Sequence, residues 1–209
     1  NTLIGIFLGS LEDYKTDRRG DVGSWCRVTA MSCLSDLILK VCCLESSRAF
    51  LSSENVTRAV GALLKQLAEK LDAVRQKAGD YLERMLLSES PEIVGVAEKS
   101  RLLDILGLSV HGPAKNWSDA SQTIPLVMRV ASIDNYFEDV VAGIVLSIGG
   151  LTENVTKQAS ASLLEWARSG ERSDRVKLIG YLVLLFETHS GQSRWILPVL
   201  KTLDHLLTH

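Results

Sequence analysis

Several kinds of residue are scarce in this sequence. Its 209 residues include only four prolines and 6% aromatic residues, and this composition argues against a β-sandwich. An excess of charge of one sign is also missing, because 23 Lys and Arg against 25 Asp and Glu leave a net charge of −2. The sequence therefore gives no reason to expect nucleic acid as a partner.

Long hydrophobic runs are absent as well. The longest apolar run, residues 140–151, is broken by glycine and is shorter than the roughly 20 residues that span a bilayer. We therefore expect no membrane insertion.

The chain is 46% apolar and 23% charged, and at this length it can bury roughly 70% of the surface that its unfolded form exposes. A globular domain with its own core is expected.

The four cysteines all fall within the first 43 residues. Cys26 and Cys33 stand seven residues apart, whereas Cys42 and Cys43 are adjacent. Neither spacing is that of a zinc site, and adjacent cysteines rarely form a disulfide. We predict that all four are small buried apolar residues of a chain kept in a reducing compartment.

Signatures of catalysis are also missing. The sequence has no phosphate-binding loop, no nucleophile elbow and no dinucleotide-binding glycine pattern. His205 and His209 are four residues apart without the glutamate of a zinc-protease motif between them. We therefore predict no catalytic residue, no cofactor and no metal ligand, and expect that the chain is not an enzyme.

Apolar residues recur at steps of three and four along almost the whole chain, which is the period of an amphipathic helix. Asp21 and Ser53 provide start signals for two of these helices. Pro125 and Pro198 fall in or near others, either in a first turn or at a bend. The expected helices cover residues 22–44, 53–71, 72–86, 96–106, 118–131, 133–148, 155–169, 173–188 and 193–207.

An internal repeat is also visible. Three aligned segments each place an alanine four residues before a leucine, and the offsets of 48 and 81 residues correspond to one and two repeats of about 40 to 47 residues. Such alanines allow close helix packing, and the leucines fill the space behind them. The pattern predicts an all-α HEAT or armadillo-like solenoid of antiparallel helix pairs without a sheet. The pairs expected to be buried are Ala30 and Leu34, Ala78 and Leu82, and Ala159 and Leu163.

Two further features qualify this architecture. Asp72 precedes Arg75, as in HEAT repeats, where an acidic residue in the turn faces an arginine of the second helix. The pattern weakens over residues 88–117, where serine, glycine and proline interrupt a short helix. We expect one domain over residues 1–209 with an irregular insertion at 88–117.

The densest group of polar residues spans positions 12–21. One interpretation is a solvated turn whose aspartates cap helices or pair with neighbouring arginines. The other is a partner-binding surface, because tyrosine and arginine are common anchors of protein interfaces. The candidate partner-binding residues are Asp13, Tyr14, Asp17, Arg18, Arg19 and Asp21.

Three segments carry a resemblance to a known family. Residues 13–25, D-Y-K-T-D-R-R-G-D-V-G-S-W, resemble the D-Y-x-T-D-x-R-G-D-V-G-x-W segment of the tubulin-folding cofactor D family, with Cys26 where that family usually has valine. Residues 147–153 are similar to its S-x-G-G-L-T-E segment, and residues 198–205 to its P-x-L-K-T-L-D-H segment. The three occur in the family's order and span most of the chain.

The resemblance implies a C-terminal piece of a longer HEAT-repeat protein in the cytoplasm, at the microtubule cytoskeleton. It implies a non-catalytic scaffold whose partners are β-tubulin, tubulin cofactors E and C and a small Arf-like GTPase, during assembly and disassembly of the αβ-tubulin heterodimer. Stimulation of GTP hydrolysis by tubulin then belongs to the cofactor complex. Arg18 and Arg19 are the only paired candidates for an arginine finger.

An alternative remains open from the repeat pattern alone. A HEAT scaffold can also serve nuclear transport or act as a regulatory subunit of a phosphatase. In either case a solenoid cut from a longer one exposes apolar surface where a neighbour is missing. The apolar segment at residues 3–8 fits such a cut, and we expect marginal stability or concentration-dependent self-association.

Overall fold

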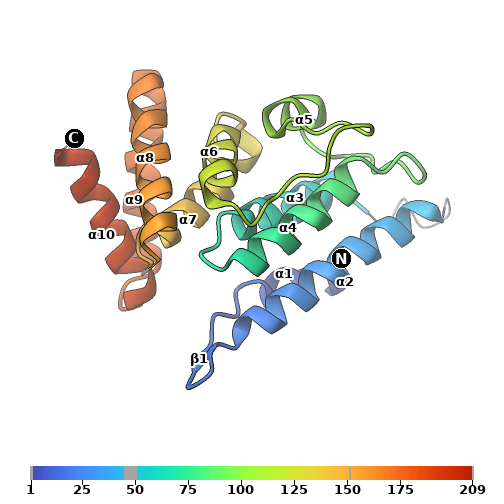
Figure 1. Ribbon diagram of the computed structural model, residues 1–209, viewed down its shortest axis with the longest axis horizontal. Helices are drawn as coiled ribbons and strands as arrows, with labels where there is room; N and C mark the ends of the chain where they lie inside the picture. The colour runs from blue at the N-terminus through green and yellow to red at the C-terminus, as the bar shows by residue number, and fades with distance from the viewer. Residues whose placement is uncertain (1, 45–50, 151, 209) are drawn as a thin grey trace.

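The computed structural model describes residues 2–44, 51–150 and 152–208. Within these ranges ten α-helices form an α-solenoid that is elongated rather than spherical, with α8, α9 and α10 at one end of its long axis (Figure 1). The elements are α1 Thr2–Ser10, β1 Thr16–Asp17, β2 Gly20–Asp21, α2 Gly23–Cys43, α3 Ser53–Leu67, α4 Asp72–Leu86, α5 Lys99–Leu106, α6 Ala120–Val130, a 3-10 turn η2 Asp134–Tyr136, α7 Phe137–Ile148, α8 Glu153–Ser169, α9 Arg172–Thr188 and α10 Ser193–Thr208.

The helices stack in two rows. One row runs from α1 through α3 and α7 to α10, each helix packing against the next. On the other side, α2 packs against α4 and α6 packs against α8, while α3 with α4 and α7 with α8 connect the two rows. This arrangement confirms the predicted all-α solenoid.

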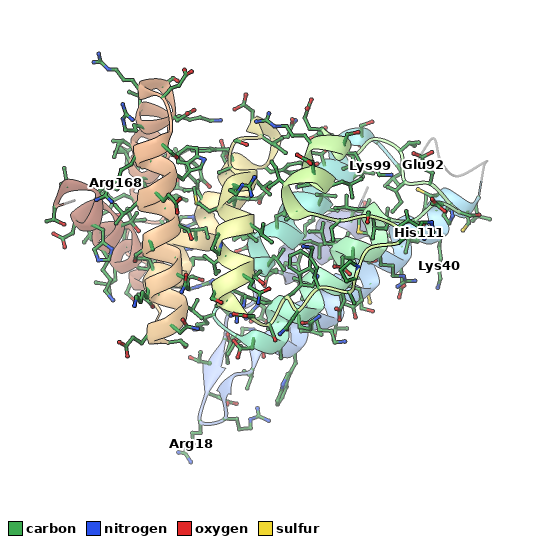
Figure 2. The ribbon with its side chains drawn as sticks, turned by 45° about the horizontal axis from the view of Figure 1, so that its top comes forward. Arg18, Lys40, Glu92, Lys99, His111 and Arg168 are labelled. Atoms are coloured by element: carbon green, nitrogen blue, oxygen red, sulfur yellow. The ribbon has the colours of Figure 1, made fainter. Side chains whose placement is uncertain are left out.

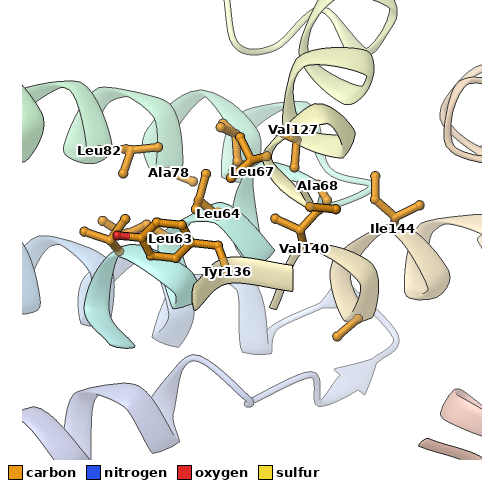
Figure 3. Close-up of a cluster of buried hydrophobic side chains, with 14 of the residues drawn as sticks. Leu63, Leu64, Leu67, Ala68, Ala78, Leu82, Val127, Tyr136, Val140 and Ile144 are labelled. Atoms are coloured by element: carbon orange, nitrogen blue, oxygen red, sulfur yellow. The ribbon is translucent and has the colours of Figure 1, made fainter. Parts of the chain in front are cut away.

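The expected repeat residues form the core. Ala78, Leu82 and Ala159 are 0% exposed, and Ala30, Leu34 and Leu163 are no more than 4% exposed. Leu82 lies beside Ala78 in a cluster with Leu63, Leu64 and Tyr136 from α3 and η2 (Figure 3). Full burial of one leucine contributes about 1.5–3 kcal/mol, so the repeat pattern identifies residues on which folding depends.

Asp72, predicted in the turn between α3 and α4, is the first residue of α4 and pairs with Arg75 as expected. Arg75 is 1% exposed, and it donates to the Glu69 carbonyl at 2.7 Å and to the Asp72 carboxylate at 2.5 Å. It also donates to the carbonyl of Ser118, a residue that lies just before α6. A single guanidinium therefore satisfies the carbonyls of one turn and fixes the next segment to it.

The structure corrects several details of the sequence prediction. Residues 3–8 belong to a helix, α1, that the prediction omitted, and α3 ends at Leu67 rather than near residue 71. The expectation of no sheet is wrong locally, because β1 and β2 form a two-stranded antiparallel ribbon. This ribbon is too short to show the alternating pattern of a strand.

The structure decides between the two alternatives for the prolines, and it differs from expectation for the cysteines. Pro125 and Pro198 lie inside α6 and α10, beyond the first turn, where proline removes one backbone hydrogen bond. Only Cys42 is buried, whereas Cys33 is half-buried and Cys26 and Cys43 are exposed. The prediction that all four are buried is therefore wrong.

The segment 88–117 contains α5 and is otherwise irregular. Its last residue is anchored to the solenoid, because the Trp117 side chain is 1% exposed and donates from Nε1 to the Glu83 carboxylate at 2.9 Å. Its ring covers Gly79, where an added Cβ would lie 2.1 Å from the indole. The absence of a side chain at Gly79 is therefore what allows the segment to return onto α4.

Candidate functional site

The polar residues 12–21 form a hairpin between α1 and α2. β1 and β2 pair Thr16 with Asp21 and Asp17 with Gly20, and Gly20 adopts a φ of +105° that favours glycine. The two residues between the strands, Arg18 and Arg19, therefore form the tip. Both are exposed.

The two arginines at the tip differ in their contacts. Arg19 pairs with Asp17, whose carboxylate accepts from the guanidinium at 2.6 Å and from the Arg19 backbone N–H at 2.7 Å. These bonds lower the pKa of Asp17. The Arg19 guanidinium also lies 5.2 Å from the Trp25 ring, whereas no described residue hydrogen-bonds or pairs with the Arg18 side chain, which points away from the helices (Figure 2).

The base of the hairpin is built around Arg27, whose side chain is 0% exposed. Arg27 donates to the Asp13 carbonyl at 2.7 Å, to the Asp21 carboxylate at 3.0 Å and to the Glu69 carboxylate at 3.2 Å. Burial opposes its charge, but the bonds to Asp21 and the charge of Glu69 outweigh burial and raise the pKa of Arg27. Asp21 also accepts from the Ser24 backbone N–H at 3.1 Å. The N-cap position of α2 is Val22 rather than the predicted Asp21, so Asp21 bonds to the first turn from one residue earlier.

Tyr14 is held between two guanidinium groups. The Cζ atoms of Arg27 and Arg194 lie 3.9 and 3.0 Å from the centre of its ring, and one face of the ring has room for only one guanidinium at such distances. The Tyr14 hydroxyl accepts from Gln66 Nε2 at 3.0 Å. Burial, together with the charges of Glu69 and Glu12, raises the pKa of Tyr14 to about 12, so the ring remains neutral at physiological pH.

The three segments that carry the family resemblance meet at this base. A hollow of about 280 Å³ is lined by Tyr14 from the first segment, Gly149 and Gly150 from the second, and Pro198 from the third. Gly149 touches Pro198 so closely that an added Cβ would lie 2.2 Å from the proline ring. Segments far apart in the sequence therefore form one structural unit.

The candidate residues thus divide into two groups. Asp13, Tyr14 and Asp21 form the braced base, whereas Asp17, Arg18 and Arg19 form the exposed tip. Sequence reasoning missed Glu69, Gln66 and Arg194, because no local pattern links them to the hairpin. The described residues hold no group of three or more His, Cys, Asp or Glu side chains placed to bind a metal ion, and none of their helices is long and apolar enough to span a bilayer.

Comparison with known proteins gives consistent results. The family model described as "Tubulin folding cofactor D C terminal" matches residues 57–209. The chain is 25% identical over 217 residues to "Tubulin-specific chaperone D" of Dictyostelium discoideum, covering 94% of this chain and 14% of the relative. It is 38% identical over 73 residues to "Tubulin-folding cofactor D" of Schizosaccharomyces pombe, covering 35% of this chain and 6% of the relative. The chain thus spans a small part of these relatives' length, and no solved structure matches it.

Proposed function

Because the chain belongs to the tubulin-folding cofactor D family, in its C-terminal part, we propose that it is a non-catalytic scaffold that binds β-tubulin or a sister tubulin cofactor through the hairpin of residues 12–21. The partners proposed for the whole protein are β-tubulin, cofactors E and C and a small Arf-like GTPase. Its site of action is the cytoplasm, at the microtubule cytoskeleton. Any stimulation of GTP hydrolysis by tubulin is a property of the assembled complex.

The observation that carries this proposal is the contrast between the hairpin's tip and its base. The base is fixed by the buried Arg27 network and by Tyr14, so the tip is held in a defined position before any partner arrives. Binding by a pre-positioned group avoids much of the entropy cost of ordering it. Arg18 and Arg19 are exposed at this tip, with Trp25 beside Arg19, and Trp and Arg are among the most frequent interface anchors.

The experiment measures how well a variant with two reversed charges, Arg18→Glu with Arg19→Glu, captures purified tubulin and cofactors E and C. We expect capture to fall at least tenfold with little change in helical content, since exposed ion pairs contribute at most about 1 kcal/mol to folding. A matched control reverses two other exposed arginines, Arg58→Glu with Arg129→Glu, and should bind like the parent. If the tip variant of the full-length protein captures its partners as well as the parent does, the hairpin has only a structural role and the proposal is wrong.

A further inference from the structure

Helix α9 is apolar on two opposite faces. The inner face packs against the solenoid through Leu178, Tyr181, Leu182 and Leu185, which are buried or half-buried. The outer face is also apolar, but its side chains are 40–64% exposed, and they are Val176, Ile179, Val183, Leu184 and Phe186. Because burial of apolar surface is favourable, an apolar face of a helix is normally covered by another element or by a partner.

Within the described part of the chain, nothing covers the outer face. α9 packs against α10 and α8 at the end of the stack (Figure 1). Gly180 lies in the middle of the outer face, and a Cβ added there would have no atom within 4 Å. The backbone of another helix could therefore approach closely at this point.

The outer face has a symmetric pattern along the helix. Its residues follow one another at steps of three or four, and they are Arg172, Val176, Ile179 with Gly180, Val183 and Glu187. The spacing is the same when the series is read from either end, but the charges at its two ends are opposite. The distance from Arg172 to Glu187 along the axis is about 22 Å at 1.5 Å per residue. The pattern thus has its centre between Ile179 and Gly180.

The terminal charges are also available. Among the described residues, neither Arg172 nor Glu187 has a hydrogen-bonding or ion-pair partner for its side chain, and both are exposed. Two other charged side chains near the start of α9 do have partners. Arg175 donates to the Gly170 carbonyl at 2.8 Å, and Lys177 forms an ion pair with Asp134. The outer face is therefore an apolar stripe with one free cation at its start and one free anion at its end.

We propose that this face binds the same face of a second copy of the chain, with the two α9 helices antiparallel about a twofold axis that passes between Ile179 and Gly180. In this arrangement Val176 packs on the partner's Val183, and Ile179 lies over the partner's Gly180. Arg172 meets the partner's Glu187 at both ends, because a twofold interface uses every contact twice. A parallel pair would instead place arginine against arginine and glutamate against glutamate, which repel.

The test is sedimentation of the 209-residue chain over a wide range of concentration. We expect a monomer–dimer equilibrium, which Val183→Glu should abolish and Glu187→Arg should weaken about tenfold. The charge swap, Arg172→Glu with Glu187→Arg, should restore the parent's dimerisation. The matched control is Val110→Glu, because Val110 is 49% exposed, close to the 45% of Val183, but lies outside α9. It should leave dimerisation unchanged.

A second variant guards against loss of folding as the explanation. Gly180→Leu places a side chain in open space in the monomer and raises helix propensity, but it blocks the close approach of two helices. We expect it to remain folded by circular dichroism and to sediment as a monomer. If the parent sediments as a monomer at all concentrations, the outer face of α9 does not bind a second copy of the chain, and the proposal is overturned. A dimer that is insensitive to the charge swap and to Gly180→Leu would overturn it equally.

Discussion

The ring of Tyr14 lies against the guanidinium of Arg194, with Arg194 Cζ 3.0 Å from the ring centre. These residues belong to the hairpin after α1 and to the first turn of α10, so one contact joins the two ends of the described chain. Arg194→Ala should lower the free energy of unfolding by about 1 kcal/mol, the usual size of such a cation–π contact. Urea denaturation measures this, and Lys201→Ala, at an exposed position of the same helix, should have no comparable effect.

Arg27 should be the most sensitive polar residue of the hairpin. Arg27→Met keeps much of the side-chain volume but leaves the carboxylates of Asp21 and Glu69, both only 8% exposed, without their cation. Removing one partner of a buried charge pair costs about 3–5 kcal/mol, so we expect a loss of this size in urea denaturation. The second substitution Glu69→Gln, made in the Arg27→Met background, should recover part of it, and no recovery would contradict the assigned pairing.

Asp139 should make stability depend on pH. Its carboxylate lies against Gly61, where an added Cβ would be 2.1 Å from Oδ2. Burial raises its pKa from 3.8 to about 6, although Lys65 opposes this effect, while Glu12 and Glu138 add to it. The folded chain therefore holds this proton more tightly than the unfolded chain, so the contribution of Asp139 to stability decreases as pH rises from about 4 to about 6.

The matched variant is Asp139→Asn, which keeps the shape of the side chain but does not ionise. Above pH 6 it should be more stable than the parent by up to about 3 kcal/mol, and this difference should disappear near pH 4. Taking the difference between the two proteins cancels the opposite contributions of Asp17, Asp119 and Asp134, whose pKa values are lowered. Thermal melts across this range provide the measurement, and parallel pH profiles would show that Asp139 is not responsible.

Leu82 tests the repeat pattern itself. It is 0% exposed, so Leu82→Ala should cost about 2–5 kcal/mol, and Leu82→Asp should abolish folding because it buries an unpaired charge. Leu207 is 84% exposed and provides the control, since Leu207→Ala should melt like the parent. Equal melting of Leu82→Ala and the parent would mean that the alanine–leucine alignment does not identify the core.

The sequence predicted what depends on local periodicity. The nine expected helices are present, and Ala78 and Leu82 are buried as their spacing indicated. Contacts between distant segments were not visible, because nothing near Tyr14 in the sequence points to Gln66 or Arg194. The outer face of α9 escaped notice for a related reason, since apolar residues on both sides of a helix give no distinct stripe.

The position of Arg194 also has a consequence for synthesis of the chain. A ribosome adds about 5–20 residues per second, so Arg194 follows Tyr14 after an interval on the order of ten to forty seconds. Until then one face of the Tyr14 ring lacks its guanidinium, although Arg27, Asp21 and Glu69 are already available. The hairpin of a nascent chain is therefore only partly braced, and its final rigidity is acquired only when α10 docks.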